Sequence, residues 1–242
     1  MNSISEILKA TNHRPWEMPA GKWKFYQEWN NALFIHWEIS IDILKNYVPQ
    51  SLTIDTFDGK AYISLVAFTM EKIRPRYLPS LSFISDFHEI NIRTYISNGN
   101  KKGVYFLNIE AEKLLSAIIA KNISGLPYEK SVMTRTKNTF ESINFDKDLL
   151  LKTDFDVNEL LPTKTELDKW LTERYCLYLE EKKSVYRYEI HHKEWEIKKV
   201  SINNLELNYN IGEIHLSAQK HCLSHYSEGV KVLAWNRNEI EI

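Results

Sequence analysis

The sequence predicts a β-dominated α+β domain, built on a curved or closed antiparallel sheet with a few helices. Three observations predict this class. Aromatic residues are abundant, with seven Trp, thirteen Tyr and ten Phe among 242 residues, and such side chains favour strands and large cores. Asp58-Gly59 and Asn98-Gly99 are hairpin-type turns between extended apolar runs. Seven Gly and seven Pro are spread without a linker-like cluster, so we expect a single domain over residues 1–242.

Four short helices are predicted from capping signals and helical periodicity. A Ser-x-x-Glu capping box opens the first, and a Ser cap and a later Pro bound the second. Apolar residues on one helical face mark the third, and a Thr-x-x-Asp pair opens the fourth. The expected helices cover residues 3–10, 40–48, 111–122 and 165–171.

Most of the remaining apolar runs predict strands. Residues 61–70 are apolar on both faces, as in a buried strand. Residues 87–96 alternate, with isoleucines at positions 90, 92 and 96 on one face. The opposite face carries Glu89, Asn91, Arg93 and Tyr95. Further strands are expected over residues 176–180, 185–192, 206–210 and 231–235.

The charge balance and the lack of targeting signals exclude several classes of protein. The formal net charge is -1, with 31 basic and 32 acidic side chains, so no overall positive field is present to bind nucleic acid. The N-terminus has no secretory signal pattern, and no apolar run approaches the roughly 20 residues of a membrane helix. Two cysteines, Cys176 and Cys222, favour thiols in a reducing compartment. We expect a cytoplasmic protein without a nucleic-acid or membrane partner.

No cofactor motif is present. The sequence lacks a Gly-x-Gly-x-x-Gly loop, a phosphate-binding loop and a Gly-x-Ser-x-Gly elbow. Two histidine-containing stretches are weak metal candidates. Glu189 and His191 share a strand face but are only two ligands, and His221 and His225 have helical spacing in a segment that suits a loop equally. We therefore expect neither a cofactor nor a metal.

Eight stretches, in order along the chain, resemble the YqjF-like family of uncharacterised bacterial proteins. They include HRPWEMP at residues 13–19, LFIHWEI at 33–39, FHEINIRTYI at 87–96, GLPYEKSVM at 125–133 and EIHHKEW at 189–195. The resemblance implies one YqjF-like domain with a fold similar to that of acetoacetate decarboxylase, a curved antiparallel sheet or barrel around a cavity. It leaves the reaction open, because that family has no agreed activity.

The lysines of the decarboxylases are missing at the matching positions. Those enzymes form a Schiff base through a lysine in a Gly-x-Pro-Lys-Lys pattern, in which the second lysine lowers the pKa of the first. In the matching stretch, which begins at Gly125, Tyr128 and Glu129 replace the two lysines. A phenol cannot form an imine, and a carboxylate raises the pKa of a nearby amine. One alternative stays open: if the segment is a strand, Lys130 shares the face of Tyr128 and reaches the same cavity.

The same resemblance identifies candidate site residues. Phe87-His88-Glu89 is similar to a Tyr-His-Glu stretch whose glutamate lies in the decarboxylase active site. The candidate catalytic residues are Glu89, Tyr128 and Lys130. The candidate substrate-binding residues are Asn91, Arg93, Tyr95, Arg174, Tyr178 and His192. Two other interpretations of the polar strand face stay open, a solvated outer surface and a buried Glu89–Arg93 ion pair that only fixes the fold.

These residues predict a small-molecule enzyme that acts on an organic-acid-like substrate in an interior cavity. Glu89 would be the general acid or base, and Tyr128 a proton donor or oxyanion partner. Arg93 would hold an acidic group by bidentate hydrogen bonds. The alternative is a binding protein that uses the same cavity without chemistry, because a fold can persist when catalytic residues are lost. A small-molecule ligand is the expected partner, and a homo-oligomer is compatible with the sequence.

Overall fold

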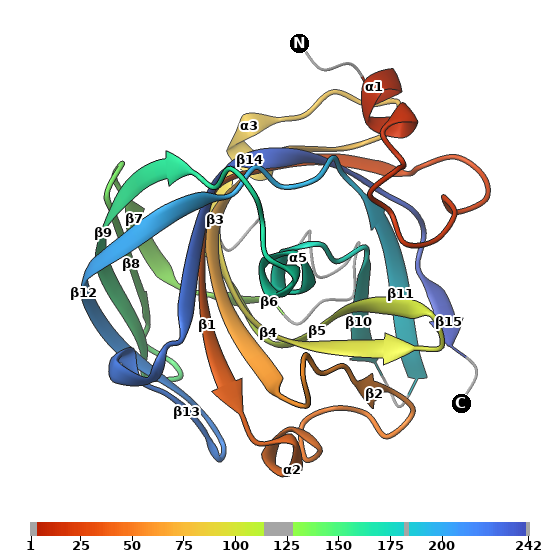
Figure 1. Ribbon diagram of the computed structural model, residues 1–242. Helices are drawn as coiled ribbons and strands as arrows, with labels where there is room; N and C mark the ends of the chain where they lie inside the picture. The colour runs from red at the N-terminus through yellow and green to blue at the C-terminus, as the bar shows by residue number, and fades with distance from the viewer. Residues whose placement is uncertain (1–3, 114–127, 182–183, 241–242) are drawn as a thin grey trace.

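One curved β-sheet organises the chain (Figure 1). The computed structural model describes residues 4–113, 128–181 and 184–240. The strands in these residues are β1 (Phe25–Ile39), β2 (Thr53–Ile54), β3 (Ala61–Pro75), β4 (Phe87–Asn98), β5 (Lys101–Ala111), β6 (Tyr128–Lys130), β7 (Val132–Arg135), β8 (Thr139–Asn144), β9 (Leu149–Leu160), β10 (Cys176–Glu181), β11 (Ser184–His191), β12 (Lys198–Ile211), β13 (Ile214–Leu216), β14 (Leu223–Ala234) and β15 (Asn238–Ile240). Their hydrogen-bonded order is β15-β11-β10-β5-β4-β3-β1-β14-β12-β9-β8-β7, with β2, β6 and β13 paired beside this path.

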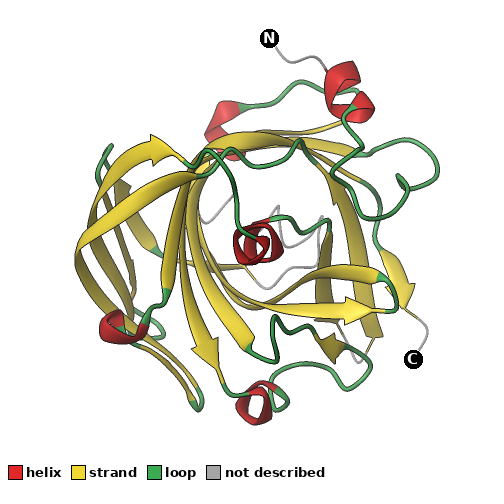
Figure 2. Cartoon of the chain, in the orientation of Figure 1, coloured by secondary structure: helices red, strands yellow, loops and turns green. Residues whose placement is uncertain are grey.

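The sheet curls until two distant strands meet. Strand β11 pairs with β10 and also with β14, where Ile190 lies opposite Ala234. The seven strands β14, β1, β3, β4, β5, β10 and β11 therefore surround an interior, which we call the ring. Helix α5 (Glu166–Thr172) is seen at the centre of this ring, and β12, β9, β8 and β7 extend the sheet to one side (Figures 1 and 2).

The predicted fold class is confirmed, with one difference in strand direction. Most neighbouring strands are antiparallel, but β6 and β10 both run parallel to β5. Parallel neighbours cannot be joined by a hairpin and need a long connection. Residues 112–127 separate β5 from β6, and the whole chain from β6 to α5 separates β5 from β10. The sheet is therefore mixed.

Three of the four predicted helices are present in the structure. Helix α1 (Ile4–Lys9) lies within the predicted span. Helix α2 (Ile41–Leu44) begins after its predicted cap, Ser40, but ends after four residues. Helix α5 has the complete capping box, because Thr165 and Asp168 each accept a hydrogen bond from the other's backbone amide. The capping signals at Ser40 and Thr165 thus fix where α2 and α5 start.

The structure differs from the prediction at two further helices and at residues 111–122. Helix α3 (Ser82–Ser85) and the short 3-10 helix η1 (Ala218–Lys220) have no side-chain cap to announce them. The predicted helix over 111–122 lies mostly outside the described residues, and its first residue, Ala111, instead ends β5. The two predicted turns are present, with positive φ at Asp58, Gly59 and Gly99.

Strand β4 is buried on both faces. Ile90 and Ile92 belong to the largest apolar core, which lies between the ring and the outer strands. Glu89, Asn91 and Arg93 point into the ring and are only 3%, 4% and 7% exposed. The predicted alternation is confirmed, and the interpretation of the polar face as a solvated outer surface is contradicted.

A β-bulge decides which side chains of β5 face the ring. The pairing of β4 with β5 shifts at one step, so that Ile92 lies opposite Asn108 whereas Arg93 lies opposite Phe106. Directly opposed residues share one face of a sheet. The bulge therefore turns Phe106 into the ring beside Arg93 and leaves Asn108 on the core side.

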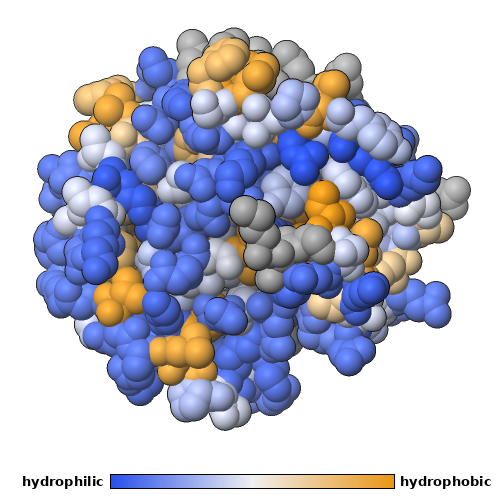
Figure 3. Space-filling model, turned by 90° about the horizontal axis from the view of Figure 1, so that it is seen from above, coloured by the Kyte–Doolittle hydropathy of each residue, from blue (hydrophilic) through white to orange (hydrophobic). Residues whose placement is uncertain are grey.

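The face of the molecule seen in Figure 3 is largely polar. Hydrophilic side chains cover most of the face in Figure 3, and apolar groups form small separate patches. Among the described residues, half of the exposed large apolar side chains belong to one segment between β3 and β4: Tyr77, Leu78, Leu81 and Phe83. No helix among the described residues has the length and hydropathy needed to cross a membrane.

Candidate functional site

A cavity of about 150 Å³ lies inside the ring. Strands β1, β3, β4 and β11 supply much of its wall, and β5, β6, β10 and β14 each add a side chain. Its aromatic lining includes Phe25, Trp29, Phe34, Phe68, Phe87 and Trp195. The few polar lining groups include Gln27, Glu89, Asn91, Arg93 and Tyr128. Four of the nine predicted site residues, Glu89, Asn91, Arg93 and Tyr128, thus meet at one cavity.

Glu89 is a buried carboxyl group in the cavity wall. It accepts hydrogen bonds from the Tyr128 hydroxyl at 2.9 Å and from the Asn91 amide at 3.2 Å. No cation among the described residues forms an ion pair with it. Burial raises the pKa of Glu89 to about 7, although both hydrogen bonds favour the anion. A carboxyl group with this pKa can both take up and release a proton near neutral pH.

Tyr128 is held beside Glu89 by the parallel pairing of β6 with β5, where it lies opposite Ile109. Burial, together with the nearby Glu89 carboxylate, raises the pKa of Tyr128 well above its ordinary value. The phenol therefore stays protonated and acts as a hydrogen-bond donor.

Arg93 is a buried cation without a counterion in the described part of the chain. Its guanidinium lies 5.6 Å from the ring centre of Phe34, and its Nε has no hydrogen-bond partner. Burial lowers the pKa of Arg93, and the neighbouring Tyr95 opposes this shift. An arginine nonetheless stays charged in a protein. The alternative interpretation of a Glu89–Arg93 ion pair is contradicted, since no such pair forms.

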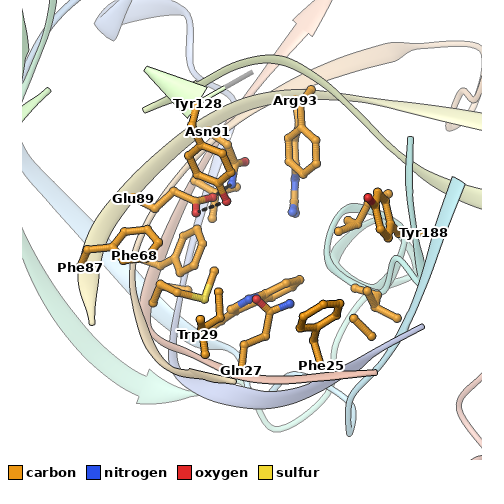
Figure 4. Close-up of a pocket in the computed structure, with 18 of the residues that line it drawn as sticks. Phe25, Gln27, Trp29, Phe68, Phe87, Glu89, Asn91, Arg93, Tyr128 and Tyr188 are labelled. Carbon is orange, nitrogen blue, oxygen red and sulfur yellow. Dashed lines mark hydrogen bonds between the residues drawn. The ribbon is translucent and has the colours of Figure 1, made fainter. Parts of the chain in front are cut away.

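The labelled side chains converge on the middle of the cavity (Figure 4). The Arg93 side chain points inward, next to the hydrogen-bonded Glu89 and Tyr128. Trp29, Gln27 and Phe25 lie on the side opposite Arg93. A ligand between these groups would have a fixed positive charge and a neutral-range acid or base on one side, and mainly apolar side chains around it.

Tyr95 lies on the same strand face as Glu89 but does not line the cavity. Its hydroxyl donates to the backbone oxygen of Leu171 in α5 at 3.0 Å and is hydrogen-bonded to Ser64 at 2.5 Å. Its ring packs 4.6 Å from that of Trp170. Helix α5 therefore occupies the space in which we expected the Tyr95 side chain to meet the cavity. The alternation of β4 could not predict this contact, because Leu171 is 76 residues away in the sequence.

A chain of hydrogen bonds continues from Ser64 to α5. His36 contacts Ser64 Oγ through Nδ1 at 2.6 Å and His225 Nδ1 through Nε2 at 3.0 Å. His225 Nε2 then contacts Asp168 Oδ1 at 2.7 Å. Burial opposes ionisation of Asp168, but hydrogen bonds from His225 and Thr165 outweigh it and lower its pKa to about 2. This chain ties α5 to β1, β3 and β14.

Arg174 and Tyr178 have partners away from the cavity. Arg174 forms an ion pair with Asp55 at 2.6 Å, and Tyr178 donates to the backbone oxygen of Lys101 at 2.7 Å. In β10 it is Leu177 that lines the cavity, so the next residue points to the opposite face. The expectation that their polar ends reach the cavity is therefore wrong.

His192 lies behind the cavity wall. Its ring packs against Tyr175 at 4.9 Å and Trp195 at 5.6 Å, and its Nδ1 contacts the backbone oxygen of Lys193 at 2.7 Å. Burial lowers the pKa of His192. Trp195, and not the imidazole, faces the cavity.

Lys130 is exposed at the end of the three-residue strand β6 and is not among the cavity residues. An ammonium group keeps its hydration there, which burial in the cavity would remove. The described part of the chain contributes no lysine to the cavity wall. The alternative that brings Lys130 beside Tyr128 is thus contradicted by its position.

The histidine-containing stretches make structural contacts. Glu189 pairs with Arg14 at 3.2 Å and Lys101 at 3.0 Å, and His191 Nε2 contacts the backbone oxygen of Ile7 at 2.8 Å. His225 lies on strand β14 and so lacks helical spacing from His221. Residues 4–113, 128–181 and 184–240 contain no group of three metal-ligating side chains.

Several cavity residues were not predicted. Phe25, Gln27 and Trp29 reach the cavity from alternate positions of β1, and Tyr188 does so from β11. The two-residue spacing in β1 is the signal that could have found them. Their depth is decided by pairing with β3 and β14, which the sequence does not reveal.

The fold is similar to that of acetoacetate decarboxylase-like proteins. The chain is similar in structure to the enduracididine biosynthesis enzyme MppR complexed with pyruvate, with a TM-score of 0.61, 9% identity and coverage of 94% of this chain and 93% of that one. An acetoacetate decarboxylase-like enzyme from Sphingomonas wittichii RW1 matches with a TM-score of 0.59 and 10% identity, over 94% of this chain and 98% of that one. The acetoacetate decarboxylase of Legionella pneumophila matches with a TM-score of 0.58 and 12% identity, over 96% of each chain.

The chain belongs to the YqjF-like family DUF2071, described as an uncharacterised conserved protein, whose model matches residues 26–231. It is 33% identical to the uncharacterised protein YqjF of Bacillus subtilis (strain 168). The alignment of 230 residues covers 90% of this chain and 93% of that protein. The family resemblance inferred from the sequence is confirmed.

Proposed function

We propose that the protein is an enzyme that moves a proton on a small organic acid bound in the cavity. The observation that carries this proposal is Glu89, a buried carboxyl group with a pKa of about 7 that faces the cavity without a counterion. A base near neutrality combines a populated anionic form with a useful driving force for proton transfer.

Each cavity residue then has a chemical role. Arg93 binds the carboxylate of the substrate, which leaves the rest of the molecule between Glu89 and the aromatic wall. Glu89 removes a proton from the carbon next to a carbonyl group and returns it later. Tyr128 donates a hydrogen bond to Glu89 in the free enzyme, which keeps that carboxyl group in place.

Two further findings support this class of reaction. The structural relative MppR is described in complex with pyruvate, a small carboxylate, although its 9% identity carries no residue roles to this chain. The lack of a lysine among the described cavity residues favours acid–base chemistry over a Schiff base.

Deuterium exchange tests the proposal without knowledge of the full reaction. The protein is incubated in D₂O with 2-oxo acids, including pyruvate and phenylpyruvate, and loss of the proton signal at C3 is followed by NMR. We expect catalysed exchange that rises with pH through about 7, because the anion of Glu89 is the base. Glu89→Gln should lower the rate at least about 100-fold.

Glu110 offers a matched control. It is a fully buried glutamate on the neighbouring strand, burial raises its pKa, and it accepts a hydrogen bond from Asn108 at 2.7 Å on the core side. Glu110→Gln should keep the exchange rate. Equal losses in both variants would attribute the effect to folding and overturn the role of Glu89. Acids that bind without any exchange would favour the binding-protein alternative.

A further inference from the structure

We infer that the ligand is a monocarboxylate with an apolar body of about one aromatic ring, and that its carboxylate lies on Arg93. The inference rests on the proposed function for the position of the site and adds the class of ligand. It is carried by the charge balance of the cavity, by the polar atoms without partners, and by the shape of the apolar remainder.

The charge balance separates Arg93 from the other deeply buried arginines. Arg174 is neutralised by Asp55 at 2.6 Å, and Arg14 by Glu189 at 3.2 Å. No described carboxylate lies within ion-pair distance of Arg93, which is 93% buried with 7% exposure. An unpaired buried cation is costly, and a fixed charge of this kind is compensated when an anion binds.

Three buried polar atoms of the cavity residues lack a hydrogen-bond partner in the described part of the chain. They are the Nε of Arg93, the indole nitrogen of Trp29 and the Oδ1 of Asn91. Buried polar atoms are nearly always satisfied in folded proteins. The Arg93 Nε is a donor, and a carboxylate offers acceptors only, so this unsatisfied atom favours an anionic ligand over a cationic one.

Arg74, the second cation in the cavity wall, does not require a second carboxylate on the ligand. Arg74 packs its guanidinium 4.7 Å from the ring centre of Tyr26, and Tyr26 belongs to a different apolar cluster from the cavity wall. The guanidinium of Arg74 thus lies on Tyr26, and we assign its contact with the cavity to its aliphatic stem. One fixed positive charge therefore matches one negative charge on the ligand.

The rest of the cavity sets the size and nature of the ligand body. Phe68, Met70, Phe87, Trp195 and Ile190 are apolar wall residues from four parts of the chain. An apolar cavity of about 150 Å³ is large enough to bind benzene. Pyruvate or acetate would leave this wall largely uncovered, whereas an aryl or branched alkyl group would cover it and gain affinity from burial.

A matched set of ligands tests the inference by binding alone. Acetate, 3-methylbutanoate, phenylacetate and phenylacetamide are titrated against the protein, with binding followed by calorimetry and by the fluorescence of the cavity tryptophans. We expect phenylacetate to bind at least about tenfold more tightly than acetate, because of its ring, and than phenylacetamide, because of its charge. Affinity should rise from acetate through 3-methylbutanoate to phenylacetate.

Arg93→Met removes the charge and keeps an apolar side chain of similar length. The preference for phenylacetate over phenylacetamide should fall to near unity in this variant. Its melting temperature without ligand should rise, because an uncompensated buried charge is lost. Arg174→Met is the matched control, and its melting temperature should fall, because Asp55 loses its partner.

The outcomes separate this inference from the proposed function. Equal affinities for phenylacetate and acetate, or an acid preference that survives in Arg93→Met, would overturn the ligand class even if pyruvate undergoes catalysed exchange. Tight Arg93-dependent binding of phenylacetate without exchange of any oxo acid would uphold the ligand class and overturn the enzyme. A lower melting temperature for Arg93→Met would also count against the inference, since it would show that the charge is compensated within the protein.

Discussion

Three buried glutamates show how neighbouring groups set the behaviour of the same side chain. Glu189 has two close cations, Arg14 and Lys101, and fixes the N-terminal segment to the sheet. Glu110 faces the core side and is surrounded by hydrogen-bond donors, including Asn108. Glu89 faces a cavity, has two donors and no counterion, and has a pKa of about 7. Of these three glutamates, Glu89 alone combines a raised pKa with a position in the cavity wall.

The hydroxyl of Tyr128 should hold the pKa of Glu89 down. Tyr128→Phe removes a hydrogen bond that favours the anion, so the pKa of Glu89 should rise above about 7. The midpoint of the pH–rate profile for oxo-acid exchange, or a carboxyl-carbon NMR titration, measures this shift.

Tyr209→Phe is the control for that experiment. Tyr209 lies near Glu110 on the core side, and each of these two groups shifts the pKa of the other, as Tyr128 and Glu89 do at the cavity. The Glu89 midpoint should not move in this variant. A downward or absent shift in Tyr128→Phe would show that the tyrosine does not stabilise the anion.

Among the elements, α5 and β5 shape the interior most directly. Helix α5 meets Tyr95 and thereby limits the cavity at one end of the ring. The bulge between β4 and β5 turns Phe106 into the ring. At the other side of β5, Gly103 allows β10 to approach, because a Cβ there would lie 2.7 Å from the Cys176 Cβ. The parallel pairing of these strands therefore depends on the absence of a side chain.

The capping box of α5 can be separated from its link to His225. Thr165→Ala should lower the free energy of unfolding by about 1 kcal/mol, the usual loss for an N-cap. Asp168→Asn weakens both the cap and the contact to His225 and should cost about 1–3 kcal/mol. Urea denaturation measures both.

Thr165→Ser keeps the capping hydroxyl and should be close to neutral. If Asp168→Asn proves no more harmful than Thr165→Ala, the hydrogen bond to His225 contributes little, and the buried chain from Ser64 to α5 is not what holds the helix in the ring.

At the scale of the whole molecule, local sequence signals predicted individual strands and helices but not the contacts between distant elements. The alternation of residues 87–96 placed Glu89, Asn91 and Arg93 on one strand face, and the family resemblance favoured the interior for that face and added Tyr128. The sequence could not show which end of β4 α5 occupies, so Tyr95 was expected in the cavity. The bulge in β5 and the β1 wall likewise depend on pairings between distant segments. Contacts of this kind follow from closure of the sheet and leave no local pattern.

The pH dependence of stability should contain two opposing contributions. Burial lowers the pKa of His191 from 6.5 to about 4, so the unfolded chain binds more protons there and stability falls as pH falls. Burial raises the pKa of Glu89 from 4.5 to about 7, so the folded chain binds more protons there and stability falls as pH rises. Both contributions operate between about pH 5 and 6.5.

Two variants should therefore change the slope of unfolding free energy against pH in opposite directions. His191→Gln should make the slope less positive and Glu89→Gln more positive, each by up to about 1.4 kcal/mol per pH unit. Urea denaturation at pH 5, 5.75 and 6.5 measures the slopes. Changes of the same sign in both variants would contradict the assigned protonation states.

The two-sided burial of β4 has a consequence for how members of this family can diverge. Its odd-numbered positions from 89 to 93 face the cavity, and Ile90 and Ile92 face the apolar core. Insertion or deletion of one residue before Glu89 would exchange the two sets and send the carboxyl and guanidinium groups among aliphatic side chains. Substitutions at the odd positions change the lining of the cavity and keep the strand in place, whereas a change in the number of residues between Phe87 and the Asn98-Gly99 turn would shift the register.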